Sequence, residues 1–256
     1  MTSRKGWTRE QLLVAFRLYC QIPFGKLHSR NPEIIRYSNF IGRTPSALAM
    51  KLSNIASLDP AIISTGRKGL AGASLADKKM WDEMQNNWES FVVESENIMA
   101  AVSQNEGEFL QTEKVVDYTG QSKLVQTCAR IGQQFFRKTV LSAYDGRCCI
   151  TGLSLPQLLV ASHIIPWKDD ESIRLNPKNG LALSMLHDKA FDLGMITIDA
   201  NMRVVVSQKY SVSHDPFFNA TIQRFAGREI TLPEKFEPDE RFLEYHRTNI
   251  FEKDLN

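Results

Sequence analysis

The chain of 256 residues has a formal net charge of +2, and 43% of its residues are hydrophobic. This apolar content is enough for a buried core, and the length suggests one large domain or two small ones. It contains no run of about 18 apolar residues, which excludes a membrane span. The basic start MTSRKGWTRE lacks the apolar centre of a signal peptide. The four cysteines show no C-x-x-C spacing, which excludes a zinc ribbon and a redox motif. We therefore expect a cytoplasmic protein.

Charge is distributed unevenly along the chain. Residues 1–56 hold nine Lys and Arg against two Glu, a formal +7, whereas residues 57–120 hold five basic against eleven acidic side chains. A basic segment beside an acidic one indicates that the first meets a polyanion. We predict a DNA-binding region at 1–58, a helical connector at 59–120 and a third domain at 121–256. The boundary before the third domain falls in the polar stretch 103–122.

Residues 7–56 predict three helices. Thr8 to Gln11 has the form of a capping box and precedes apolar residues at helical spacing. A second helix begins near Pro32, and the third has Thr44 as N-cap with Pro45 at its first position.

The turn at Gly42 into the third helix gives this region a helix-turn-helix layout. With Trp7-Thr8 near its start, the region resembles Myb-like and homeodomain-like DNA-binding modules. The resemblance implies that Arg43, Ser46 and Lys51 lie near DNA, mainly at phosphates. The alternative is that the third helix only packs against its neighbours.

Further elements follow in chain order. Small residues and glycines predict a loop over 59–73, and apolar spacing predicts a helix over 74–101, a candidate self-association face. A basic amphipathic helix is predicted over 123–143. Two β-rich runs separated at Asp199-Ala-Asn201 predict a hairpin.

Four short motifs follow one another between residues 148 and 199. They are CCITG at 148–152, SHIIPW at 162–167, NPKNGLAL at 176–183 and HDKAFDLG at 187–194. Their order and content resemble the HNH nucleases, in particular the restriction-endonuclease-like branch, and Gly132-Gln133 resembles the lead-in of that branch. The resemblance implies an α+β protein, in which a helical helix-turn-helix-like domain precedes a ββα-metal (HNH) nuclease domain.

The resemblance also implies roles for individual residues. His163 would be the general base, because a neutral histidine near pH 7 can accept a proton from water. Asn179 would brace the loop that orients it, and His187 would be a metal ligand on a helix that begins near Leu181. Asp192 lies about 500° further round this helix than His187, so it joins the site if the helix ends or bends before Gly194.

Ser162 stands where many HNH nucleases carry Asp or His as a metal ligand. The missing carboxylate would then come from Asp192, or from Asp145 or Asp170. A sparse, water-rich coordination sphere of this kind suits Mg²⁺ or Mn²⁺.

The expected function is that of a metal-dependent DNA endonuclease of restriction or defence type, acting on double-stranded DNA. Lys168, Arg174 and Lys178 would contact phosphates in its cleft. One site per chain favours a homodimer for cutting both strands. Two alternatives stay open: a DNA-binding regulator with a silent HNH-like domain, and a nuclease of RNA or toxin type.

Overall fold

The computed structural model describes residues 6–64, 66, 72–105, 122–211 and 215–251. Contacts between Cα atoms divide the chain into two compact units, residues 1–139 and 140–256. The division lies inside helix α7 (Ser122–Ala143). The predicted boundary at 103–122 falls largely on 106–121, outside the described residues. Within the described part of the chain, no helix is long and apolar enough to cross a membrane.

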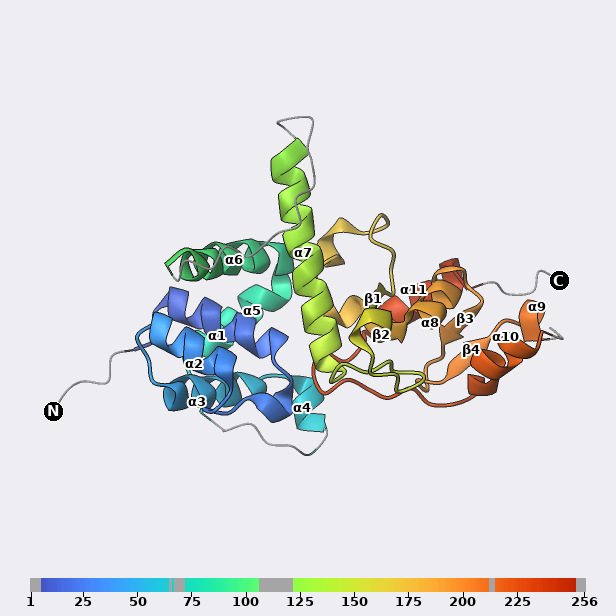
Figure 1. Cartoon of the computed structure of the whole chain (residues 1–256), viewed down its shortest axis with the longest axis horizontal. Helices are drawn as coiled ribbons and strands as arrows, with labels where there is room; N and C mark the ends of the chain where they lie inside the picture. The colour runs from blue at the N-terminus through green and yellow to red at the C-terminus, as the bar shows by residue number, and fades with distance from the viewer. Residues whose placement is uncertain (1–5, 65, 67–71, 106–121, 212–214, 252–256) are drawn as a thin grey trace. The chain divides into compact units, whose positions relative to one another are not determined.

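The N-terminal unit is helical (Figure 1). Its helices before α7 are α1 (Arg9–Gln21), α2 (Pro32–Phe40), α3 (Pro45–Ala56), α4 (Pro60–Ser64), α5 (Leu75–Asn86) and α6 (Trp88–Asn105), with a 3-10 turn η1 (Phe24–Lys26). The capping box at Thr8 and the N-cap at Thr44 form as predicted. Helix α1 contacts α3, α5 and α6, and its Leu13, Phe16 and Tyr19 side chains are almost wholly buried. It is therefore the centre of this unit.

Two predictions for the middle of the chain were wrong in detail. The single helix expected over 74–101 is two helices, because Asn87 leaves the helical path and its side chain accepts the N–H of Ser90 at the start of α6. The loop expected over 59–73 contains the short helix α4, whose first turn is held by Asp59 accepting the N–H of Ala61.

The C-terminal unit combines two small antiparallel sheets with helices, which confirms the α+β prediction. Its strands are β1 (Leu159–His163), β2 (Gly180–Ser184), β3 (Ile196–Ile198) and β4 (Val204–Val206); β1 pairs with β2 and β3 with β4. Its helices are the end of α7, α8 (Met185–Asp192), α9 (Gln208–Ser211), α10 (Pro216–Thr221) and α11 (Glu240–Asn249), with 3-10 turns η2 (Pro156–Leu158), η3 (Glu171–Ile173), η4 (Pro177–Asn179) and η5 (Gln223–Phe225). The hairpin predicted around Asp199-Ala-Asn201 is β3–β4.

The predicted start of the site helix near Leu181 was wrong. Residues Gly180–Ser184 form strand β2, and all five are buried. The helix α8 begins at Met185, after Ser184 as N-cap.

Helix α11 fixes the position of α8 and β3 through a buried histidine. The His246 ring stacks on Phe191 at 3.6 Å between centroids, and its Nδ1 lies 2.9 Å from Thr197 Oγ1. The Phe191 carbonyl accepts from His246 Nε2 at 3.1 Å. Because both ring nitrogens are hydrogen-bonded and the residue is 1% exposed, His246 joins three elements through one side chain.

Candidate active site

The frame of the site is the β1–β2 pair followed directly by α8. The register places His163, the last residue of β1, opposite Gly180, the first residue of β2. The chain between these strands is a loop of residues 164–179. After β2, the Ser184 hydroxyl accepts the N–H of His187 and starts α8, which packs on both strands. A histidine, a loop and a helix therefore meet in one small unit.

The His163 ring is half-buried, and its Nε2 lies 3.0 Å from the Arg174 carbonyl oxygen. A carbonyl can only accept, so Nε2 carries the proton and Nδ1 carries the lone pair. Burial lowers the pKa of His163, while the Arg174 carbonyl and the charge of Asp188 oppose this effect. The ring is therefore neutral at pH 7, the form that a general base requires.

Asn179 fixes the backbone that leaves His163. Its side-chain oxygen accepts the Ile165 N–H at 2.8 Å, and its amide donates to the Ile165 carbonyl at 3.1 Å. Its own carbonyl accepts the Ile164 N–H at 2.9 Å. Asn179 is 1% exposed, so these bonds are shielded from water and restrain the loop next to the histidine.

Trp167 and Arg174 close the loop around the same ring. Trp167 meets His163 edge to face at 5.4 Å between centroids, and the Arg174 guanidinium lies 5.1 Å from the Trp167 ring centroid. Arg174 Nε also donates to the Trp167 carbonyl at 3.1 Å, and its other arm pairs with Glu171. Arg174 thus holds the loop that presents its carbonyl to His163.

Two carboxylates, Asp188 and Asp192, lie one turn apart on α8. Residues four apart are about 40° apart around a helix, so both lie on one face. Burial raises the pKa of Asp192, and the charge of Asp188 raises it further. The same Asp188 charge acts on His163. Asp188 therefore lies close enough to both His163 and Asp192 for its charge to act on the pKa of each.

These features lie in residues 148–199, which match the family model described as HNH endonuclease. This segment belongs to the HNH endonuclease family. The match contains β1, β2, α8 and β3, and therefore His163, Asn179 and the carboxylates of α8. A search of curated proteins found no match to the chain.

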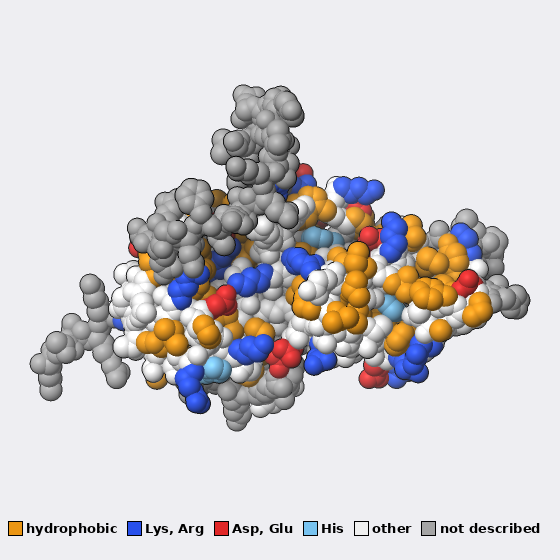
Figure 2. Space-filling view, viewed as in Figure 1, with side chains coloured by type: hydrophobic (Ala, Val, Ile, Leu, Met, Phe, Trp, Pro, Cys, Tyr) orange, Lys and Arg blue, Asp and Glu red, His pale blue; other side chains and the backbone are white. Residues whose placement is uncertain are grey.

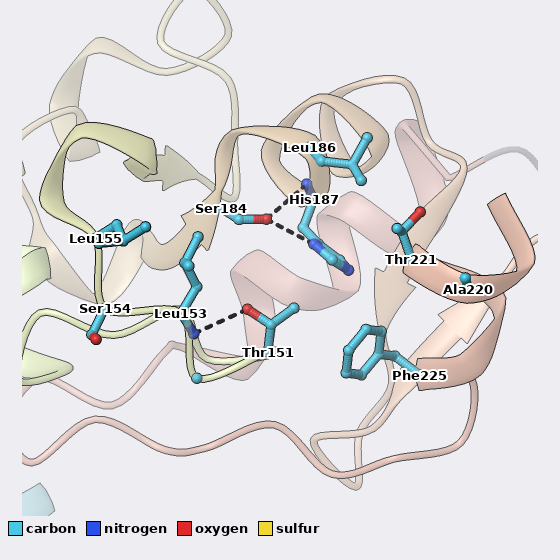
Figure 3. Close-up of a pocket in the computed structure, with 11 residues that line it drawn as sticks. Thr151, Leu153, Ser154, Leu155, Ser184, Leu186, His187, Ala220, Thr221 and Phe225 are labelled. Atoms are coloured by element: carbon cyan, nitrogen blue, oxygen red, sulfur yellow. Dashed lines mark hydrogen bonds between the residues drawn. The ribbon is translucent and has the colours of Figure 1, made fainter. Parts of the chain in front are cut away.

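In this HNH domain, His187 lies on another side of α8 from Asp192. It is 3% exposed, its Nδ1 lies 2.8 Å from Ser184 Oγ, and its Nε2 makes no hydrogen bond. Burial lowers the pKa of His187, an effect that the backbone of Thr221 partly opposes without completing a hydrogen bond. The ring lines a pocket that neither His163 nor Asp192 lines (Figure 3). The structure thus does not bring the expected metal pair His187 and Asp192 together.

Ser162, which stands at the usual position of a metal ligand, and the alternative carboxylates Asp145 and Asp170 have other surroundings. Ser162 is 2% exposed and pairs with Leu181; since successive strand residues point to opposite faces, its hydroxyl faces away from the His163 ring. Asp170 caps the turn η3 by accepting from Ser172, and Asp145 is exposed in the turn after α7.

The donor set of the HNH domain fits one kind of metal. In the described part of the chain, no three His, Cys, Asp or Glu side chains form a group that could hold a metal ion, which does not fit the closed ligand set of structural zinc. Mg²⁺ and Mn²⁺ need only one or two carboxylates beside water. Asp188 and Asp192 would supply them, and a bound cation would reduce the repulsion between the two carboxylates. Asp188 was missed from the sequence, although its i, i+4 spacing to Asp192 was visible.

The predicted DNA contacts differ in exposure. Lys168 is exposed and Lys178 half-buried, whereas Arg174 is held in the loop. In the N-terminal unit Ser46 is exposed at the start of α3.

Two of the N-terminal residues predicted to contact DNA interact with other residues of the N-terminal unit instead. Lys51 is 6% exposed, and its Nζ lies 2.8 Å from both carboxylate oxygens of Asp77. Arg43 donates to Gln11 at 2.8 Å and lies over the Trp7 ring. Lys51 is thus not presented to a phosphate, and it leaves the set of DNA contacts that we propose.

Proposed function

We propose that the protein is a metal-dependent DNA endonuclease of restriction or defence type, acting in the cytoplasm. The observation that carries this proposal is the state of His163 in an HNH domain. Its ring is neutral, its Nε2 donates to the Arg174 carbonyl, and its backbone is braced by Asn179. A fixed neutral imidazole is what phosphodiester hydrolysis needs as base.

In the proposed reaction, Nδ1 of His163 takes a proton from the attacking water as its oxygen bonds to phosphorus. The bond from phosphorus to the 3′ oxygen then breaks, and the leaving oxygen takes a proton from solvent. General base catalysis of this kind contributes about 10²–10⁴-fold. Asp188 and Asp192 would hold Mg²⁺ or Mn²⁺, which when bound stabilises negative charge on the phosphoryl oxygens. Lys168 and Lys178 would attract the DNA backbone.

The basic N-terminal unit supports double-stranded DNA as the substrate. Residues 1–56 carry the formal +7, and α2 and α3 join through the tight turn at Gly42, whose φ is +63°. Ser46 and Arg43 border this turn. Cutting both strands with one site per chain favours a homodimer, which sedimentation with and without DNA tests.

The decisive experiment uses purified full-length protein and supercoiled plasmid with Mg²⁺, Mn²⁺ or EDTA. Nicked or linear products are expected with either metal and not with EDTA. His163→Ala should abolish cleavage while leaving the circular dichroism spectrum unchanged. His28→Ala, a histidine outside the HNH domain, is the matched control. Undiminished cleavage by His163→Ala would overturn the role of His163.

A second candidate function is a DNA-binding regulator whose HNH domain is silent. The buried Ser162 and the lack of a three-donor group in the described residues favour it. It predicts DNA binding without any cut product under Mg²⁺, Mn²⁺, Ca²⁺ or Zn²⁺. Comparing single-stranded RNA with duplex DNA in the same assay separates both functions from an RNA nuclease.

A further inference from the structure

A pocket of about 520 Å³ lies beside α8, on the side of His187. This volume falls in the range of about 300–1,000 Å³ that is common for small-ligand sites. Three segments of the C-terminal unit form it: the loop Thr151–Leu155, the start of α8, and the end of α10 with η5. In Figure 3 the His187 ring, Thr221 and Phe225 surround one side of the space, and Leu153 and Leu155 lie across from them.

The His187 ring is aimed into this pocket with one nitrogen unused. Ser184 holds Nδ1 at 2.8 Å, and the edge-to-face contact with Phe225 at 5.4 Å fixes the ring plane. Among the described residues Nε2 completes no hydrogen bond, although His187 is 3% exposed; the backbone of Thr221 lies close enough to raise its pKa. Buried polar groups are nearly always hydrogen-bonded, so this nitrogen is placed to bond a polar group that enters the pocket.

The described residues around the pocket do not form a metal site. Among them the lining contains His187 but no carboxylate, no cysteine and no second histidine, so they would offer an ion one ligand. Apolar walls with a single convergent polar atom instead suit a flat, partly polar organic group.

Two exposed arginines that are not part of the pocket lining contact Phe225, which is part of it. The guanidinium groups of Arg224 and Arg228 lie 5.3 and 5.6 Å from the Phe225 ring centroid, and both side chains are exposed. Guanidinium groups bind phosphate through paired hydrogen bonds. Figure 2 shows that hydrophobic side chains are exposed in patches on the C-terminal unit, with Lys and Arg around them; those exposed at the pocket include Leu155 and Leu186.

We propose that this pocket binds one unpaired nucleotide of the DNA substrate. The base packs against Phe225 and hydrogen-bonds to Nε2 of His187, and the phosphate is held by Arg224 and Arg228. Enzymes and binding proteins that take a base out of the stack read it in this way, with apolar contact and edge hydrogen bonds. The proposal rests on the proposed function, because it makes the nucleotide part of the nuclease substrate.

The test is a binding measurement in EDTA, where cleavage does not occur. Full-length protein with ¹⁵N-labelled histidine is titrated with the four deoxynucleoside monophosphates, and the His187 Nε2 resonance is followed by NMR. At least one nucleotide should shift this resonance. Phe225→Ala should weaken its binding about tenfold or more, since base–aromatic packing dominates such sites. Phe217→Ala removes an exposed phenylalanine of α10 outside the pocket, and it should change the affinity for the nucleotide less than twofold.

A second variant separates the base from the phosphate and avoids any loss of folding. The surface double variant Arg224→Gln/Arg228→Gln should weaken binding of the monophosphate and leave binding of the uncharged deoxynucleoside unchanged. Arg241→Gln, an exposed arginine of α11, is its control.

Several outcomes would overturn the proposal. These are an unmoved His187 resonance with all four nucleotides, equal effects of Phe225→Ala and Phe217→Ala, or a shift caused by an apolar peptide and by no nucleotide. Plasmid cleavage with an unmoved His187 resonance would reject the pocket and keep the nuclease. Nucleotide binding through Phe225 without DNA binding or cleavage would keep the nucleotide site and reject the nuclease.

Discussion

The backbone carbonyl of Arg174 lies 3.0 Å from Nε2 of His163, across eleven positions of the chain. This contact sets the tautomer of the proposed base, and it exists only if the loop 164–179 keeps its shape. Asn179, which closes that loop onto Ile165, therefore acts on the chemistry without touching the histidine ring.

Replacing Asn179 by Ala should lower both stability and cleavage. The change leaves the buried N–H and C=O of Ile165 without their side-chain partner, which costs about 1–3 kcal/mol of the free energy of unfolding. Urea unfolding measures this loss, and plasmid cleavage by the folded variant should also slow. The control Asn201→Ala, at the exposed β3–β4 turn, should have a free energy of unfolding within about 0.5 kcal/mol of the parent. An Asn179 variant as active and stable as the parent would contradict the bracing role.

The His163 ring should titrate below its ordinary pKa of about 6.5, since burial disfavours the charged form. Asp188→Asn removes a negative charge that favours the charged ring, so the pKa of His163 should fall further. NMR titration of the ring in metal-free protein gives both midpoints. A midpoint that rises in Asp188→Asn would show that Asp188 does not act on His163. Asp145→Asn, in the exposed turn after α7, serves as the control.

The stability of the C-terminal unit should depend on pH through His246. Burial lowers the pKa of His246 to about 4, against about 6.5 for an unfolded histidine. The contribution of neutral His246 to the free energy of unfolding is thus fully present above pH 6.5. It is lost as the pH falls toward 4, and the loss is on the order of 3 kcal/mol. Unfolding by urea between pH 4 and 8 measures the slope. In His246→Gln this part of the slope should vanish; an unchanged slope would assign it to other groups.

Lys51→Ala should destabilise the N-terminal unit strongly, because it leaves the Asp77 carboxylate buried without a counter-charge. Breaking such a pair costs about 3–5 kcal/mol. Lys138→Ala, which breaks an exposed pair with Glu33, should cost less than about 1 kcal/mol. If Lys51→Ala instead stays stable and loses DNA affinity, the original prediction of a phosphate contact is restored.

The sequence was most informative where structure is set locally. Thr44 followed by Pro45 starts α3 through one side-chain bond and one fixed dihedral angle, and both are readable from neighbouring residues. Likewise the match to the HNH family could be predicted in advance, because the order of the four motifs along the chain is itself the pattern.

Features decided by packing were not readable in this way. Strand β2 is buried on both faces, so its apolar run shows no alternation and was assigned to a helix. The side of α8 that each residue faces depends on segments far along the chain, such as Phe225 against His187. Spacing alone therefore could not tell that the charge of Asp188 acts on His163, whereas His187 lines a separate pocket.

Adjacent residues of α8, His187 and Asp188, differ by about 100° around the helix and face different surroundings. The register of the helix is set by Ser184, which caps its first turn. A one-residue insertion between Ser184 and His187 would move His187 to the helical position of Asp188 and so place an imidazole near His163. A one-residue deletion would instead move Asp188 to the helical position of His187 and so place a carboxylate in the apolar pocket. The number of residues between the Ser184 cap and Asp188 is therefore more strictly constrained than their identity, and length variation in this turn should be tolerated far less than substitution.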